Sequence, residues 1–167
     1  MRLSEWRAGA PAREAMTAKV LAVVEPVLSA LGAGRDIDCW VAWGDEPAVR
    51  YAILAPVAAG LVVCHVRVNL PQEGPRVSAK LVRWNRVQLG ELGVETQGSH
   101  RLLSFQVEGH VLRGVDAEAD AIAAFALTLM SATDGHPPPE VRTSPARRRR
   151  AAAAPPARAR AGATRTT

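Results

Sequence analysis

Apolar residues recur at every second position through much of the segment between Ile37 and Leu112, and this alternation restricts the folds open to the chain. Successive side chains of a strand point to opposite faces, so the spacing predicts strands with one apolar face. The pattern is clearest where one face would carry Val62, Cys64, Val66, Val68 and Leu70, and the other His65, Arg67 and Asn69. Turn-forming sequences such as 44–47, 71–75 and 97–100 separate these runs, which favours antiparallel pairing.

Helical patterns flank the strands on both sides. Residues 12–31 carry an apolar stripe at helical spacing that ends before Gly32, and Pro26 predicts a kink or a division in that helix. A second helix is expected over 117–132, with Asp116 as its N-cap. The predicted fold class is therefore α+β, an antiparallel sheet or small open barrel of five to seven strands between an N-terminal and a C-terminal helix. Gly109 predicts a β-bulge before Val111.

The charges divide the chain into two parts. All 16 acidic residues lie at or before Glu140, and eight of the 21 basic residues lie in 142–167. We expect one α+β domain over 1–134, with strands at about 37–113, and a disordered, low-complexity tail rich in Pro, Ala and Arg over 135–167. The tail arginines that could bind a polyanion include Arg147, Arg148, Arg149, Arg150, Arg158 and Arg160. Their contacts to phosphate would give non-specific nucleic-acid affinity, although a GC-rich genome also accumulates arginine.

Composition limits where the protein works. Two cysteines, Cys39 and Cys64, are too few for a disulfide framework and indicate free thiols in a reducing compartment. The N-terminus lacks the apolar core of a signal peptide, and the longest uncharged run, Tyr51–Val66, is too short for a membrane span. We expect a soluble, cytoplasmic protein with no membrane span.

Motifs for catalysis, cofactors and metals are absent. The sequence has no phosphate-binding glycine loop, and the histidines occur singly, without metal-ligand spacing. Adjacent Ser99 and His100 do not form a catalytic pair, because consecutive side chains usually point apart. Asp116, Glu118 and Asp120 resemble the start of a calcium loop, but helix capping explains them. No cofactor and no metal are predicted, and an enzyme is not favoured.

One polar stripe remains as a candidate binding surface. If the central strands are neighbours, one face of the sheet would present a basic, hydrogen-bonding surface with a ring able to stack on a ligand. An ordinary solvated sheet face is the alternative interpretation. The residues of this stripe are Arg50, His65, Arg67, Asn69, Lys80 and Trp84.

The sequence thus favours a non-enzymatic binding or adaptor module whose partner is an unknown protein or a second copy, with weak polyanion affinity in the tail. One alternative is a small enzyme or ligand carrier with a pocket between sheet and helices, where Cys64, His65, His100 or His110 would supply the reactive group. The other is a structural homo-oligomer subunit, which predicts an exposed apolar patch around Trp40 or Trp6.

Overall fold

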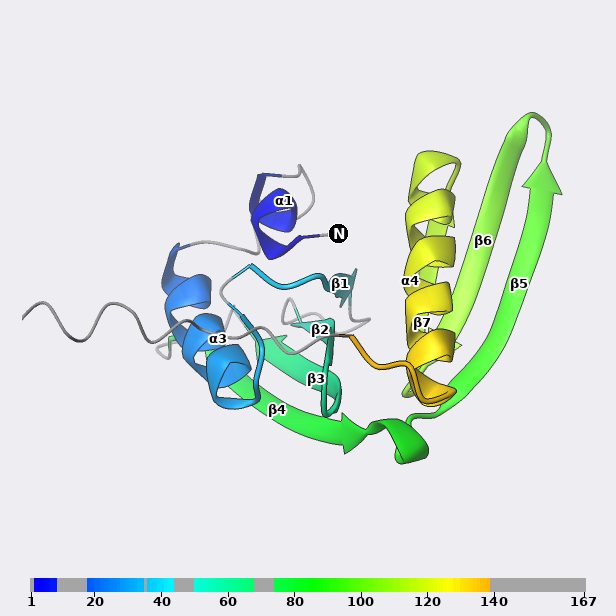
Figure 1. The fold of residues 1–167 in the computed structure, drawn as a ribbon. Coiled ribbons are helices and arrows are strands. Elements are labelled where there is room, and N and C mark those ends of the chain that lie inside the picture. The colour runs from blue at the N-terminus through cyan, green and yellow to red at the C-terminus, as the bar shows by residue number, and fades with distance from the viewer. Residues whose placement is uncertain (1, 9–17, 35, 44–49, 68–73, 139–167) are drawn as a thin grey trace, which may run out of the picture.

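The structure of the chain, a computed structural model, describes residues 2–8, 18–34, 36–43, 50–67 and 74–138. The α+β class is confirmed: helices flank seven antiparallel strands within these residues (Figure 1). The helices are α1 (Leu3–Ala8), α3 (Ala18–Ala30), the 3₁₀ helix η1 (Trp84–Arg86) and α4 (Ala117–Thr133). The strands are β1 (Trp40–Trp43), β2 (Arg50–Val57), β3 (Gly60–Arg67), β4 (Arg76–Arg83), β5 (Leu89–Gln97), β6 (His100–Val107) and β7 (His110–Val115).

The strands form two sheets and no closed barrel. The first has the order β1-β2-β3-β4 and the second the order β5-β6-β7, so within each sheet the strands that are neighbours along the chain pair with each other. After β4 the chain enters η1, where the extended backbone is interrupted and the second sheet begins. Of the two predicted arrangements, the described residues show antiparallel sheets, and the strands do not close into a barrel.

A two-residue turn, and not a bulge, accounts for Gly109. Glu108 and Gly109 have φ angles of 49° and 79° between the paired residues Val107 and His110. Two consecutive positive φ angles are typical of the type I′ turn, whose twist matches that of the strands it connects. The bulge prediction is wrong because the residues on either side belong to separate strands. A register irregularity lies instead in β5, between Leu89 and Leu92.

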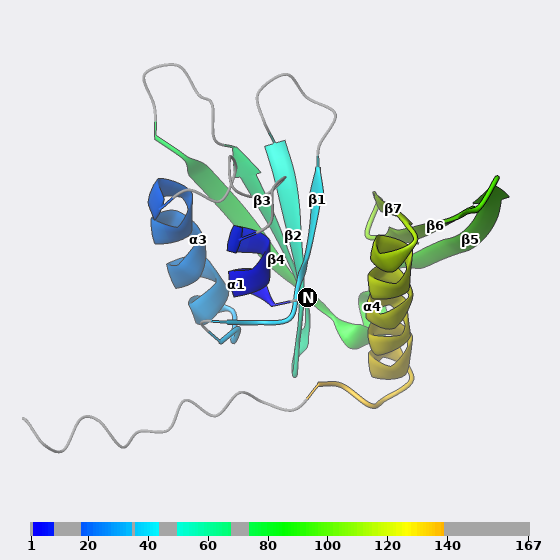
Figure 2. The same cartoon turned by 90° about the horizontal axis from the view of Figure 1, so that it is seen from above.

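Both faces of the four-stranded sheet are covered. Figure 2 shows α3 on one side of this sheet, and α4 with the three-stranded sheet on the other. The residues of β3 from Gly60 to Cys64 are all buried, whichever face they point to. The core consequently has two layers, one beneath α3 and one between the sheets.

The observed helices agree in part with those predicted from the sequence. α3 buries Val20, Leu21, Val24 and Leu28 and continues through Pro26 without division, whereas residues 9–17 of the predicted helix lie outside the described residues. Asp116 occupies the N-cap position of α4 with φ 52°, but its side chain makes no capping hydrogen bond. No helix in the described part of the chain combines the length and the apolar character needed to cross a membrane.

The two tryptophans that the structural-subunit alternative would expose, Trp6 and Trp40, are buried inside the chain. Trp40 packs edge-on against Trp6 of α1, with ring centroids 5.4 Å apart, and also contacts Phe125 of α4. The indole nitrogen of Trp6 donates to the carbonyl oxygen of Cys39. An exposed patch around Trp40 or Trp6, which the structural-subunit alternative predicted, is contradicted because α1 and α4 cover these rings.

Candidate functional site on the three-stranded sheet

The predicted polar stripe is aligned as expected but only partly exposed. The register pairs Arg50 with Arg67 and Arg67 with Arg76, so these three positions follow one another across β2, β3 and β4. Leu54 and Val63 lie on the same face and are buried, because α4 and the three-stranded sheet pack there. The expectation of a solvated sheet face is therefore wrong over most of its area.

Several of the predicted binding residues cannot be placed as side chains. Asn69 and the tail arginines Arg147–Arg150, Arg158 and Arg160 lie outside the described residues, and of Arg50 only the backbone is described. Arg67 is exposed at the end of β3. The role of these residues in binding stays a prediction.

Trp84 has a structural role in linking two parts of the fold. It belongs to η1 and not to β4, and its ring is half-buried. The indole nitrogen donates to the carbonyl oxygens of Val57 and Ala58 at 3.1 and 3.2 Å. A ring held this way links η1 to the β2–β3 turn, which accounts for Trp84 without a stacked ligand.

Lys80 connects the two sheets. Its Nζ donates to Oε2 of Glu108 at 3.0 Å, and Oε1 of the same carboxylate accepts from the backbone N–H of Gln88 at 2.9 Å. The Glu108 side chain is 8% exposed, so this ion pair is partly shielded from water. Lys80 thus fastens β4 to the β6–β7 turn.

Two histidines meet between the sheets. Nε2 of His65 on β3 lies 3.1 Å from Nε2 of His110, the first residue of β7, and the ring centroids are 5.2 Å apart. The two histidines share no sequence motif, because 45 positions separate them along the chain. Their contact depends on how the two sheets pack, for which the local sequence carries no signal.

The other two reactive-group candidates do not join this pair. Cys64 points to the opposite face of β3 from His65, and burial raises the pKa of its thiol to about 12. His100 lies at the start of β6, where its Nδ1 is 2.7 Å from the carboxylate of Asp116. A hydrogen bond from His100, followed by one from the backbone N–H of Arg101, lowers the pKa of Asp116. The acidic residues at the start of α4 therefore bind β6, since Arg101 also contacts Asp120.

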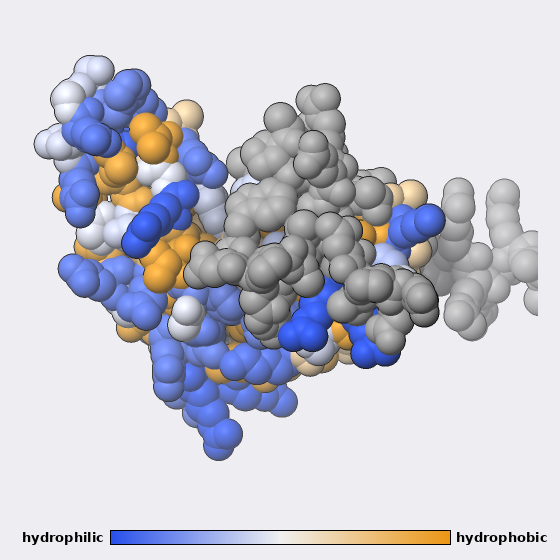
Figure 3. Space-filling view, turned by 180° about the vertical axis from the view of Figure 1, so that it is seen from behind, coloured by the Kyte–Doolittle hydropathy of each residue, from blue (hydrophilic) through white to orange (hydrophobic). Residues whose placement is uncertain are grey.

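The three-stranded sheet has two unlike faces. α4 covers the part of one face that belongs to β6 and β7, where Leu103, Phe105, Val107 and Leu112 are buried. Gly114 permits this close packing, because a Cβ there would lie 2.9 Å from Cδ1 of Ile122. The opposite face carries Val111 and Val115, which are 49% and 44% exposed. Seen from behind in Figure 3, this part of the surface shows hydrophobic residues among hydrophilic ones.

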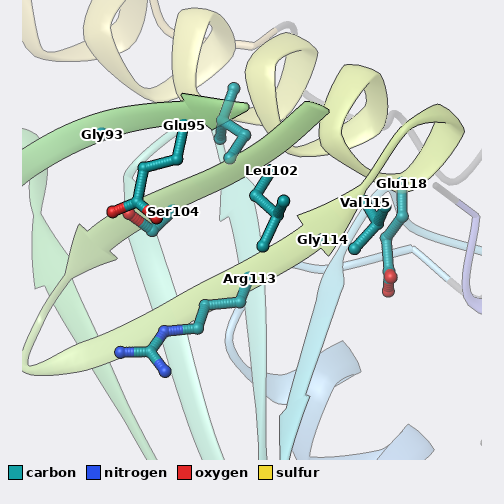
Figure 4. Close-up of a pocket in the computed structure, with 9 residues that line it drawn as sticks. Gly93, Glu95, Leu102, Ser104, Arg113, Gly114, Val115 and Glu118 are labelled. Carbon is teal, nitrogen blue, oxygen red and sulfur yellow. The ribbon is translucent and has the colours of Figure 1, made fainter. Parts of the chain in front are cut away.

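We call this opposite face the exposed sheet face and define it by Glu95, Leu102, Ser104, Val111, Arg113 and Val115. The register confirms that these residues share one side, since Glu95 pairs with Leu102, Leu102 with Val115 and Ser104 with Arg113. An open groove of about 390 Å³ lies over it, and Figure 4 shows Glu95 and Arg113 on opposite sides of β6. Gly93 leaves space beside Ser104, because a Cβ there would lie 2.9 Å from Ser104 Oγ.

The chemistry of this face is that of a recognition surface. The groove over it is lined by branched apolar side chains, two carboxylates and one guanidinium, and its lining contains no histidine or cysteine. Among the described residues, no group of three or more His, Cys, Asp or Glu is placed to hold a metal ion. Comparison of the chain with protein-family models, with curated proteins and with solved structures finds no match.

Proposed function

We propose that the protein is a non-enzymatic binding module that associates through the exposed sheet face, and that a second copy of the chain is the partner this face fits best. The observation that supports the proposal is the exposure of Val111 and Val115 on a face opposite the one that α4 covers. Exposed apolar side chains that share a face with charged residues are typical of protein interfaces.

Charge complementarity favours a second copy. Glu95 lies on β5 and Arg113 on β7, with β6 between them. A two-fold axis parallel to β6 would place β5 of one copy over β7 of the other. Glu95 would then lie over Val115, two positions along β7 from Arg113, so the long arginine side chain could reach each carboxylate. This pairing would occur twice per dimer, as the self-complementary interface of a two-fold dimer requires.

The size of the face predicts a weak association. Three strands of about six residues present roughly 20 Å by 14 Å. That area of about 280 Å² is well below the ~800 Å² that each partner of a stable complex usually buries. We therefore expect a dissociation constant in the micromolar range or weaker.

The experiment is sedimentation velocity on the full-length chain from micromolar to near-millimolar concentration. Arg113→Glu and Glu95→Arg should each weaken dimerisation about tenfold by placing like charges together, and the double exchange should restore it. Arg86→Glu, on exposed η1, reverses a charge elsewhere and serves as the control. A chain that stays monomeric at the highest concentration, or a double exchange that does not restore association, refutes this interface.

We also propose that the basic tail adds weak, non-specific polyanion affinity, separable from the domain. Eight arginines in contact with duplex DNA would give a log–log salt slope near −7. Replacing Arg147–Arg150 with alanine should therefore reduce the slope by about 3.6 if all four contact phosphate. An unchanged slope would show that the tail does not carry the affinity.

Two free thiols agree with a reducing compartment, and we propose the cytoplasm.

The enzyme alternative has less support. Of its four candidate groups, only His65 and His110 converge, and the thiol of Cys64 stays protonated on the other face of β3. A nucleophile activated by a base requires the two within hydrogen-bond distance.

A further inference from the structure

The contact between His65 and His110 has the geometry of a metal-binding pair. The two Nε2 atoms are 3.1 Å apart in a partly buried position. With metal–nitrogen bonds of 2.0–2.1 Å, this separation corresponds to an N–metal–N angle of roughly 95–100°. That angle lies between the octahedral and tetrahedral values, so both rings could bind one ion with only small shifts.

Each imidazole is positioned by a strand and not by a loop. In β3, His65 is flanked by its register partners Ala52 on β2 and Ser78 on β4. His110 pairs with Val107 directly after the β6–β7 turn, and Lys80 and Gln88 hold that turn through Glu108. Ligands fixed by regular strands lose little freedom when a metal binds.

We propose that His65 and His110 form a two-histidine site for a divalent transition metal, with Zn²⁺, Ni²⁺ and Cu²⁺ as the ions whose chemistry suits imidazole. Without metal, one ring donates an Nε2–H hydrogen bond to the other. When a metal binds, the proton of the donor ring must be on Nδ1 and no longer on Nε2. Both Nε2 lone pairs can then bind the ion, and no redox change is involved. Among the described residues no third His, Cys, Asp or Glu joins the pair, so water would complete the coordination.

The site would join the two sheets. His65 belongs to the four-stranded sheet and His110 to the three-stranded sheet, so a shared ion would bridge them. Binding to the folded chain stabilises it in proportion to the logarithm of metal concentration over the dissociation constant. We therefore expect added metal to raise the Tm of the wild-type chain.

The test is a titration of the full-length, chelator-treated chain with Zn²⁺ by calorimetry, and with Cu²⁺ by electron paramagnetic resonance. We expect one Zn²⁺ per chain and a Cu²⁺ spectrum with coupling to two nitrogens. His65→Gln and His110→Gln should each weaken Zn²⁺ binding at least tenfold and abolish the metal-dependent rise in Tm. His136→Gln, at an exposed position, is the matched control and should change neither.

Three results would overturn the proposal. The first is that the wild-type chain shows no saturable Zn²⁺ binding. The second is that the wild-type chain and both site variants bind Zn²⁺ with equal affinity, and the third is that His136→Gln loses as much Zn²⁺ affinity as the site variants. Circular dichroism of each variant guards against misfolding. If a glutamine variant does not fold, the Cu²⁺ spectrum of the wild-type chain decides, because coupling to fewer than two nitrogens refutes the site.

Discussion

The position of α4 can be tested with two leucines of the same helix. Leu129 is fully buried, whereas Leu127, two residues earlier, is 67% exposed. Replacing either by alanine makes the same change in side chain and in helix propensity. The difference in unfolding free energy between the two variants therefore reports burial alone.

The expected magnitudes follow from these exposures. Removing three carbon groups from a fully buried site costs about 2.4 kcal/mol in transfer free energy, and the cavity raises the total for Leu129→Ala to roughly 2.7–5 kcal/mol. Leu127 keeps only a third of that area from water and would leave no cavity, so Leu127→Ala should cost about 0.8 kcal/mol or less. We expect Leu129→Ala to be the less stable variant by at least about 1.5 kcal/mol.

Urea unfolding followed by circular dichroism measures both values, and unchanged m-values would show that the midpoints report stability. If the two variants lose equal stability, or Leu127→Ala loses more, the face of α4 assigned to the core is wrong. The described packing between α4 and β6 would then have to be abandoned.

Two further predictions concern titratable groups. Burial raises the pKa of Cys39 and Cys64 to about 12. A thiol reagent at pH 8 should therefore label the native chain slowly, and it should label two thiols once the chain is unfolded. Rapid labelling of the native chain would contradict the burial of these thiols. The pKa of Asp116 is lowered chiefly by the hydrogen bond from His100, so its stabilising contribution is present above the ordinary carboxyl pKa and is lost as the pH falls through the lowered value. His100→Ala should raise the Asp116 pKa in a carboxyl-carbon NMR titration, and an unchanged value would mean that the backbone N–H of Arg101 alone maintains the shift.

The sequence predicted strand faces better than it predicted what covers them. Alternation in β3 placed His65 and Arg67 on one face and Cys64 on the other, as the register shows. The same alternation suggested that the polar side faces water, yet Leu61 and Val63 on that side are buried. Alternation of apolar and polar residues at every second position identifies a strand and its two faces. Only the packing of a second layer decides which face remains exposed.

The candidate sites depend on contacts between distant residues. Neither the His65–His110 pair nor the exposed sheet face has a local motif, because each arises from register and from the placement of whole sheets. α1 was missed for a related reason. Six residues are too few for a helical stripe, and α1 is held by Leu3 N–H donating to Ile37 and Ser4 N–H donating to Asp36.

The order of strands in the two sheets has a consequence for how the chain folds. Within each sheet every strand pairs with its neighbour in sequence, so each sheet can form by closing short loops, and local pairing favours rapid folding. The contacts made by Glu108 and His110 across the junction need both sheets in place first. We therefore expect two cooperative folding units whose docking is the last step, and amide hydrogens at the junction that exchange before those at the centre of either sheet.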